Sequence, residues 1–183
     1  MLGPLLTRLL GRLRGAPRID PAGAPSIDPA EELARADRLE AEGRLEEATA
    51  SYRRALAAAP AGFPPAAAGW NNLGWVLQRQ SRLDESAQAY GQALAIDPAL
   101  VIARNNLGTI HRYRGDLDAA LAEHERALRD KPDDAVTHLN LGTVLLKQGE
   151  AGRALDHLRR AAQRAPKNDE IQRALVLALN YLP

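Results

Sequence analysis

The chain has 183 residues, of which 45% are hydrophobic, and its 24 basic residues nearly balance 23 acidic ones. This composition excludes a disordered chain and disfavours a nucleic-acid partner, while the absence of cysteine excludes disulfides and thiolate metal sites and fits a cytoplasmic protein. No apolar run approaches the roughly 18 to 20 residues that span a bilayer.

Residues 1–28 differ from the rest of the chain. Their first half carries arginines without a neighbouring acid, and one helical face of residues 1–14 holds Leu2, Leu5, Leu6, Leu9, Leu10 and Leu13. This pattern predicts a short basic amphipathic helix, which a proline-rich tether joins to the remaining chain. Three docking alternatives stay open: a partner, the chain's own array, or an anionic membrane surface, which would make the protein peripheral at the membrane. A fourth alternative is that residues 1–14 are simply disordered.

From residue 29 onward the sequence is repetitive. A degenerate unit over residues 29–62 and a rigid, proline-containing insertion over residues 63–66 precede three consecutive blocks of 34 residues, 67–100, 101–134 and 135–168. Leu-Gly recurs at 73–74, 107–108 and 141–142, and the blocks share closing prolines at Pro98, Pro132 and Pro166. A last helix is expected over residues 169–182. A fixed period of this length indicates one supersecondary unit stacked on copies of itself.

Each block is expected to be an antiparallel pair of helices. β-branched residues are scarce, which favours helix over strand. The glycine of Leu-Gly should lie where the first helix approaches the second, and the closing proline ends the second helix. The matching small residues of the second helices are expected to be Ala93, Ala127 and Ala161. The sequence therefore predicts an all-α superhelix of four helix pairs and a C-terminal helix.

These blocks resemble the tetratricopeptide repeat. The first full block fits its pattern at Trp70, Leu73, Gly74, Leu77, Ser86, Tyr90, Ala93 and Pro98. The resemblance covers residues 29–182 and implies a right-handed solenoid whose concave groove binds a protein or peptide partner. No catalytic motif or phosphate-binding loop accompanies it, and His111, His124 and His138 stand where packing aromatics are usual. We expect a scaffold that is not an enzyme and that carries neither cofactor nor metal.

The first helices of the blocks should line the groove. Counting from the start of each block gives the candidate peptide-binding residues Asn71, Asn72, Trp75, Arg79, Asn105, Asn106, Thr109, Arg112, Tyr113, Asn140, Thr143 and Lys147. None of them is acidic, so the groove is predicted to be polar to basic, with Trp75 and Tyr113 as large apolar contacts. Asp37 and Glu40 occupy corresponding places in the degenerate unit and make that end more acidic.

Asn72, Asn106 and Asn140 are one block apart and are expected to form a ladder whose amides pair with an extended peptide backbone. The ladder and the Leu-Asn-Tyr-Leu-Pro of residues 179–183 resemble the repeat region of bacterial relatives of the protein O-linked N-acetylglucosamine transferases. This resemblance implies an alternative function, substrate recognition for a catalytic domain absent from this chain. Under this alternative function the chain would be a fragment. Under the scaffold function it would be a stand-alone module. The asparagines could instead pair with a neighbouring helix or with solvent.

The last helix is apolar on every side. Its apolar residues are Leu175, Val176, Leu177, Leu179, Tyr181 and Leu182. Ile171, Leu175 and Leu179 have helical spacing, and one stripe of the helix is expected to cover the last block, either the side of Leu175 and Leu179 or that of Val176 and Leu177. Because a helix that is apolar all round is normally buried, the remaining residues predict a second protein surface. Its partner would be another copy of the chain, a different subunit or a missing C-terminal domain.

Overall fold

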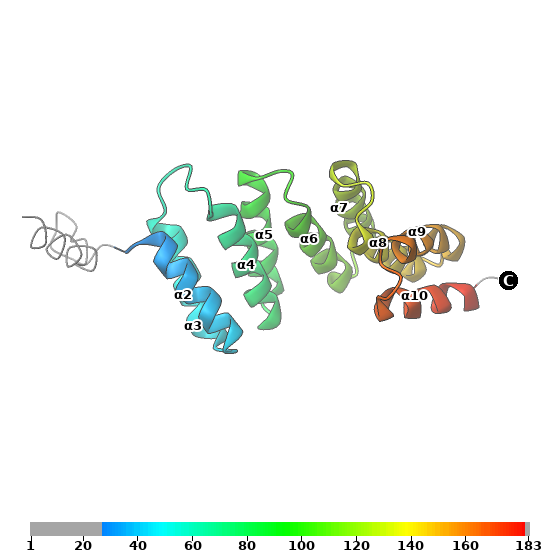
Figure 1. Ribbon diagram of the computed structural model, residues 1–183, viewed down its shortest axis with the longest axis horizontal. Helices are drawn as coiled ribbons and strands as arrows, with labels where there is room; N and C mark the ends of the chain where they lie inside the picture. Colours follow the sequence, from blue (N-terminus) through cyan, green and yellow to red (C-terminus); the bar gives the residue numbers. More distant parts are fainter. Residues whose placement is uncertain (1–26, 182–183) are drawn as a thin grey trace, which may run out of the picture.

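The structure is a computed structural model that describes residues 27–181. Within this range the chain is helical and contains no strand (Figure 1). The helices are α2 (Pro29–Ala41), α3 (Leu45–Ala58), α4 (Ala66–Arg79), α5 (Leu83–Ile96), α6 (Val101–Arg114), α7 (Leu117–Asp130), α8 (Ala135–Lys147), α9 (Ala151–Arg164) and α10 (Asp169–Asn180). The leucines of the amphipathic helix predicted for residues 1–14, and Leu182, lie outside the described residues.

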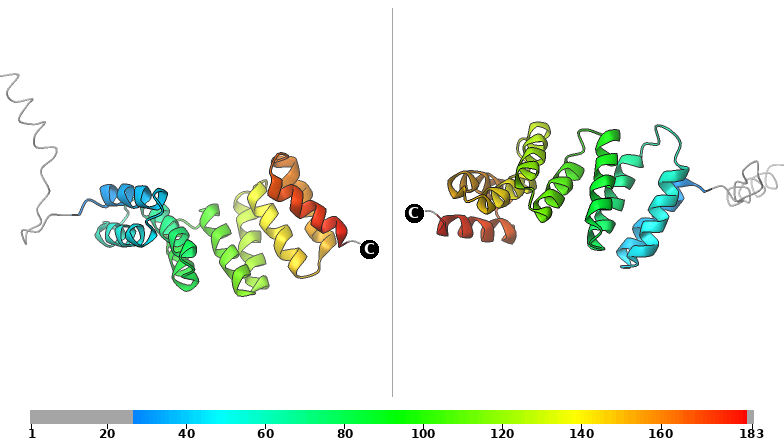
Figure 2. Two further views of the ribbon diagram at one scale, coloured as in Figure 1. Left: turned by 90° about the horizontal axis from the view of Figure 1, so that it is seen from below. Right: turned by 180° about the vertical axis from the view of Figure 1, so that it is seen from behind.

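The helices form antiparallel pairs that stack along one axis. Each of α2, α4, α6 and α8 packs on the helix that follows it, and each pair packs on the next. Helix α10 packs on both α8 and α9. Figure 2 shows that the stack turns gradually from α2 to α10 instead of closing into a globule. The prediction of an all-α superhelix of four pairs and a terminal helix is confirmed.

The turns inside the pairs need a residue with positive φ. Gly43, Gly115 and Gly149 occupy this place with φ between 77° and 82°. In the block of residues 67–100 the same place holds Ser81, with a φ of 61°. A side chain in this left-handed region is unfavourable, so Ser81 is a strained position in an otherwise regular array.

The Leu-Gly glycines lie against large side chains of the second helices. A Cβ atom built on Gly74 would lie 2.7 Å from Cε1 of Tyr90. The pairs are Gly74 with Tyr90, Gly108 with His124, and Gly142 with Leu158. Ala93, Ala127 and Ala161 were expected as the matching small residues of the second helices, but the side chains nearest to the glycines are these larger ones. Those alanines are buried, but the glycines make room for the large residue that stands three positions earlier.

Helix α10 contacts the array through one stripe of apolar side chains. Ile171 and Ala178 are buried, and Leu175 is half-buried beside them. Leu179 is 47% exposed, so the stripe that covers the array does not include it. The side chain of Asn168 accepts hydrogen bonds from the backbone N–H groups of Glu170 and Ile171, and this N-cap fixes where the helix begins.

Candidate functional site: a groove along the first helices

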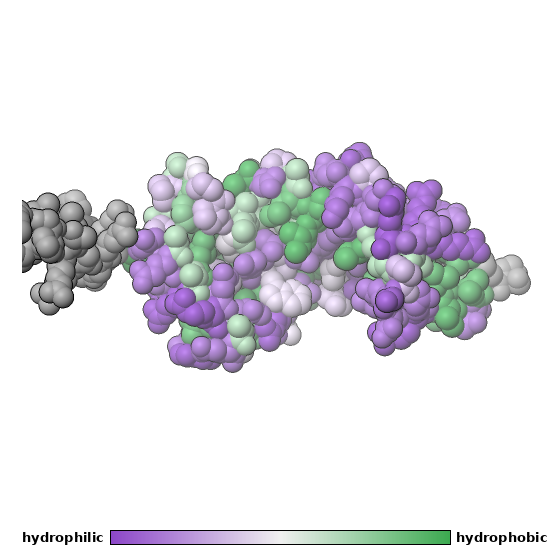
Figure 3. All heavy atoms as spheres, in the orientation of Figure 1, coloured by the Kyte–Doolittle hydropathy of each residue, from purple (hydrophilic) through white to green (hydrophobic). Residues whose placement is uncertain are grey.

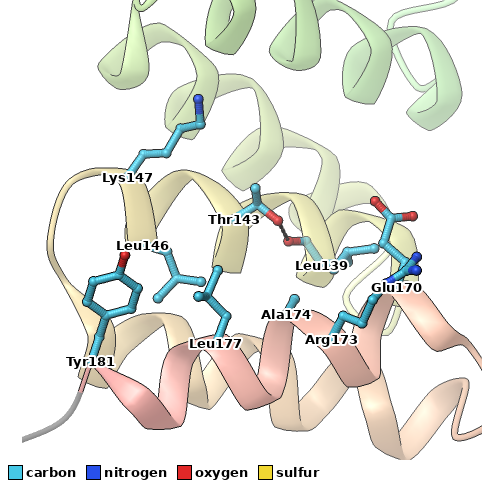
Figure 4. Close-up of a pocket in the computed structure, with 9 residues that line it drawn as sticks. All are labelled: Leu139, Thr143, Leu146, Lys147, Glu170, Arg173, Ala174, Leu177 and Tyr181. Carbon is cyan, nitrogen blue, oxygen red and sulfur yellow. Dashed lines mark hydrogen bonds between the residues drawn. The ribbon is translucent and has the colours of Figure 1, made fainter.

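A pocket with a volume of about 540 Å³ lies between α8 and α10 (Figure 4). We call it the C-terminal pocket. It is lined by Leu139, Thr143, Leu146 and Lys147 of α8 and by Glu170, Arg173, Ala174, Leu177 and Tyr181, which belong to α10 and the residue that ends it. The α8 residues stand at the groove positions of their block. The pocket is therefore the last part of the groove, closed on one side by α10.

The C-terminal pocket combines an apolar floor with a charged rim. Leu146 and Leu177 point toward each other across it, and the ring of Tyr181 lies beside Leu146 (Figure 4). The Thr143 hydroxyl donates to the Leu139 carbonyl at 2.9 Å, so it is already satisfied within α8. The rim carries Lys147, Arg173 and one acid, Glu170. Such a site suits a large apolar side chain next to a negative charge.

The structure brings together residues that the sequence assigned to two separate surfaces. Thr143 and Lys147 were expected in the groove, and Leu177 and Tyr181 were expected at a C-terminal interface. All four line one pocket. Sequence reasoning missed three of the residues that join them, namely Glu170, Arg173 and Ala174. Their signal was available, because continuing the 34-residue register into residues 169–182 places them at groove positions.

The predicted groove positions continue from this pocket over α6 and α4. Trp75 and Tyr113 are 45% and 57% exposed there, as expected for apolar contacts of a ligand. Two further groove positions, Ile102 and Val136, are also exposed apolar side chains. A smaller pocket of about 220 Å³ lies between α2 and α4 at the other end. Its lining residues are Ala30, Leu33, Ala34, Asp37, Tyr52, Pro65, Ala68, Gly69 and Asn72.

Two of the predicted groove asparagines are buried inside the array. Asn105 donates from Nδ2 to the Thr137 hydroxyl at 2.7 Å, and its Oδ1 lies 3.0 Å from Nδ1 of His124. Asn71 donates to Oδ1 of Asn72 at 3.2 Å. The Asn105 amide therefore connects α6 to α7 and α8, and Asn71 also accepts from Nδ2 of Asn106 in α6. Both amides are buried, contrary to their predicted role as groove contacts.

The asparagine ladder is partly occupied by the protein itself. Asn72 donates to Oδ1 of Asp37 at 3.3 Å, and Asn106 donates to Oδ1 of Asn71 at 3.2 Å. The half-buried Asn140 makes no side-chain hydrogen bond with another described residue. The alternative interpretation, pairing with a neighbouring helix, thus holds for the amide donors of the first two asparagines.

The cations of the groove are partly neutralised. Arg79 forms an ion pair with Glu40 of α2. The Arg112 guanidinium lies 4.8 Å from the ring centroid of Tyr113, within the range of a cation–π contact. Lys147 remains exposed. The Thr109 hydroxyl donates to the Asn105 carbonyl at 3.0 Å and is satisfied within α6. The Glu40 carboxylate thus offsets the charge of Arg79, whereas Arg112 and Lys147 keep their positive charge for a ligand.

The histidines are packed in the array. His124 is fully buried, and burial lowers its pKa to about 4, so its ring is neutral near neutral pH. Nδ1 of His138 lies 2.9 Å from Nδ1 of His157, and Nε2 of His138 lies 3.0 Å from the Pro132 carbonyl. No cluster of three or more metal-binding side chains occurs among residues 27–181, and no helix in this range is long and apolar enough to cross a membrane.

A further hollow of about 430 Å³ lies among α3, α4 and α5, away from the groove positions. It is lined by Arg53, Trp70, Leu73, Leu77, Glu85, Gln88, Ala89 and Gln92. An ion pair joins Arg53 to Glu85. This hollow is a reference surface against which binding in the groove can be tested.

Comparison with known proteins agrees with the repeat pattern. Models of the tetratricopeptide repeat match residues 67–100 and residues 105–169, together more than half of the chain. A search of curated proteins found no match.

Solved structures share the fold at low sequence identity. A tetratricopeptide repeat protein from Parabacteroides merdae is 19% identical with a TM-score of 0.74, and the match covers 84% of this chain but 59% of that protein. MamA is 18% identical with a TM-score of 0.72, covering 84% and 81%. YrrB, described as a tetratricopeptide repeat protein with an unusual peptide-binding site, is 19% identical with a TM-score of 0.68, covering 80% and 73%. The repeat matches and the shared fold show that this chain belongs to the tetratricopeptide repeat proteins.

Proposed function

We propose that the chain is a protein-interaction scaffold that holds a segment of a partner protein in its groove, with one apolar side chain anchored in the C-terminal pocket. The observation that carries this proposal is the pocket itself, in which Leu146 and Leu177 face each other beneath an open mouth. Burying one leucine-sized side chain is worth about 1.5 to 3 kcal/mol, more than a single hydrogen bond contributes. The pocket therefore holds the anchoring side chain, and the groove sets the direction in which the bound segment runs.

The ligand class follows from the charges around the anchor. Lys147 and Arg173 lie at the rim with only Glu170 opposing them, so we infer that an acidic residue flanks the anchor residue. Trp75 and Tyr113 then offer apolar contacts farther along the same surface. Peptide binding by YrrB supports this use of the fold.

Substrate recognition for a glycosyltransferase is the less supported alternative. It requires free amides along the groove, whereas the donors of Asn72 and Asn106 are engaged with Asp37 and Asn71. Only Asn140 keeps its side-chain amide free of other described residues. Because each amide has two N–H groups, Asn72 and Asn106 keep one N–H apiece, so the ladder would have one complete rung and two weakened ones.

Selection from a phage-displayed library of random peptides tests the proposal. We expect the enriched peptides to share a large apolar residue next to an acid, and Leu177→Glu to weaken their binding at least tenfold. The matched control is Val176→Glu, which places the same charge on the same helix but outside the pocket. Circular dichroism should show unchanged helicity for both variants, because both residues are exposed. Equal binding by both variants would refute the anchor.

A further inference from the structure

The groove begins with a second pocket, the one of about 220 Å³ between α2 and α4, which we call the N-terminal pocket. Its apolar lining residues are Ala30, Leu33, Ala34, Pro65 and Ala68. Among the described residues that line it, Asp37 carries the only charge. The N-terminal pocket therefore suits an apolar side chain that stands next to a base.

The Asp37 carboxylate keeps one oxygen for such a base. Its Oδ1 accepts hydrogen bonds from the Tyr52 hydroxyl and from Nδ2 of Asn72, the latter at 3.3 Å. Its Oδ2 makes no hydrogen bond with another described residue, and the side chain is exposed. The two bonds to Oδ1 hold the carboxylate in place, so Oδ2 presents a fixed acceptor to a guanidinium at the edge of the pocket.

Charge changes sign along the array. Acids outnumber bases in residues 29–62, whereas bases outnumber acids in residues 135–181. Hydrophilic side chains dominate the surface over α2 and α3 (Figure 3). The rim of the C-terminal pocket carries Lys147 and Arg173, so the two ends of the groove favour ligands of opposite charge. A basic apolar segment is therefore directed to the N-terminal pocket.

The chain itself contains a segment with this chemistry. Residues 1–14, which we call the N-terminal segment, hold three arginines, six leucines and no acid. An arginine adjoins a leucine at positions 8–9, 12–13 and 13–14. Each of these dipeptides combines the apolar side chain and the base that the N-terminal pocket suits, and each would meet repulsion at the basic C-terminal pocket.

The N-terminal segment is joined to the array beside the N-terminal pocket. Residues 15–28 connect it to α2, and Ala30 in the first turn of α2 lines the pocket. Fully extended, this connection reaches about 45 Å, so the segment can turn back to the pocket. A short tether holds its two ends at a roughly millimolar effective concentration, so even a weak contact within the chain is populated.

We propose that the N-terminal segment binds in the N-terminal pocket of its own chain, with a leucine between α2 and α4 and the neighbouring arginine on Oδ2 of Asp37. The contact covers the first part of the groove and leaves the C-terminal pocket open. A partner segment anchored at the C-terminal pocket would have to displace the N-terminal segment in order to reach α2. The contact does not depend on the proposed function, because the chain supplies both surfaces.

A spin label on the N-terminal segment tests this contact. The chain has no cysteine, so a Thr7→Cys variant carries a single nitroxide label. In the isotope-labelled chain the nuclear magnetic resonance signals of Asp37 and Ala68 should broaden, while those of Thr143 and Leu146 should not. A mixture of spin-labelled chain without isotopes and isotope-labelled chain without spin label should show no broadening, because the contact lies within one chain.

Matched variants test the charge of the N-terminal pocket. Ala34→Arg places a cation in the pocket and should remove the broadening of the Ala68 signal. Ala57→Arg is the control, because Ala57 is also an exposed helical alanine but does not line the pocket. Circular dichroism should show unchanged helicity for both variants. Added salt should weaken the broadening in the Thr7→Cys chain, since part of the attraction is between exposed charges.

Several results would overturn the contact. Signals of the array that stay sharp mean that the N-terminal segment does not bind the array. Broadening at Thr143 and Leu146 places the segment in the C-terminal pocket, and broadening in the mixture places it on a second copy. Equal broadening in Ala34→Arg and Ala57→Arg excludes the N-terminal pocket. Peptide binding in the C-terminal pocket is measured separately with Leu177→Glu, so a failure of either proposal is recognised by itself.

Discussion

A Cβ atom on Gly142 would lie 2.5 Å from Cγ of Leu158, so this pair sets how closely α8 and α9 approach. The Ala154 carbonyl oxygen is also only 3.3 Å from the same position, and backbone cannot move aside as a side chain does. We expect Gly142→Ala to destabilise the array by about 1 to 3 kcal/mol in urea unfolding. Gly152→Ala is the control, since nothing lies within 4 Å of a Cβ there and alanine favours the helix. An unchanged midpoint for Gly142→Ala would contradict the close approach.

Ser81 and Gly115 occupy the same turn in neighbouring blocks, with φ of 61° and 82°. Glycine adopts this conformation without the clash that a Cβ atom introduces. Ser81→Gly should therefore raise the free energy of unfolding by about 1 kcal/mol, and Gly115→Ser should lower it by a similar amount. Thermal unfolding of the two variants checks this, and a loss of stability in Ser81→Gly would show that the serine side chain has a stabilising role.

The buried His124 predicts an acid-sensitive array. Burial holds the pKa of His124 at about 4, below its ordinary value of 6.5. The unfolded chain binds a proton at a higher pH than the folded chain does, so stability is complete above about pH 6.5 and falls as the pH decreases to 4. The loss from this residue should be on the order of 3 kcal/mol. His124→Leu should reduce the slope of stability against pH in that interval. An unchanged slope would mean that His124 is not a source of the acid sensitivity.

Asn105 is predicted to stabilise the fold and not to bind ligand. Its amide joins α6 to Thr137 of α8 and to His124 of α7, and it is 5% exposed. Asn105→Ala leaves buried partners without a hydrogen bond and should cost about 1 to 3 kcal/mol of stability. Asn140→Ala should cost much less, because this half-buried side chain bonds to no other described residue. Chemical unfolding of both variants compares the two roles. Equal losses of stability in Asn105→Ala and Asn140→Ala would contradict a special structural role for Asn105.

The sequence predicts the fold because its signals are local and repeated. Leu-Gly and the closing proline recur every 34 residues. Leu-Gly indicates where a first helix approaches its second helix, and the proline indicates where the second helix ends. The phase of α10 could not be read in the same way. From residue 174 to residue 182 only Asn180 is polar, so polarity does not show which face is buried. The 34-residue register aligns Ala178 with the buried Val144, but it also aligns the exposed Leu179 with the buried Leu145.

The site could be predicted only in part. The register identifies Trp75, Thr143 and Lys147 as groove residues. It does not show which of the adjacent residues Asn105 and Asn106 is buried. Which of two adjacent amides is covered depends on the next helix in space, here through Thr137 of α8. Predicting the C-terminal pocket takes one further step. Residues 169–182 must be aligned with the first helices of the blocks, whose register α10 continues.

The most direct test of the account is to map, by nuclear magnetic resonance, where a library-selected peptide binds the labelled chain. Binding in the groove predicts that the signals of Thr143, Leu146, Leu177 and Tyr181 change together during the titration. The signals of Glu85, Gln88 and Gln92, which line the hollow among α3, α4 and α5, should stay in place. Changes confined to that hollow, with the C-terminal pocket unaffected, would contradict the proposed function.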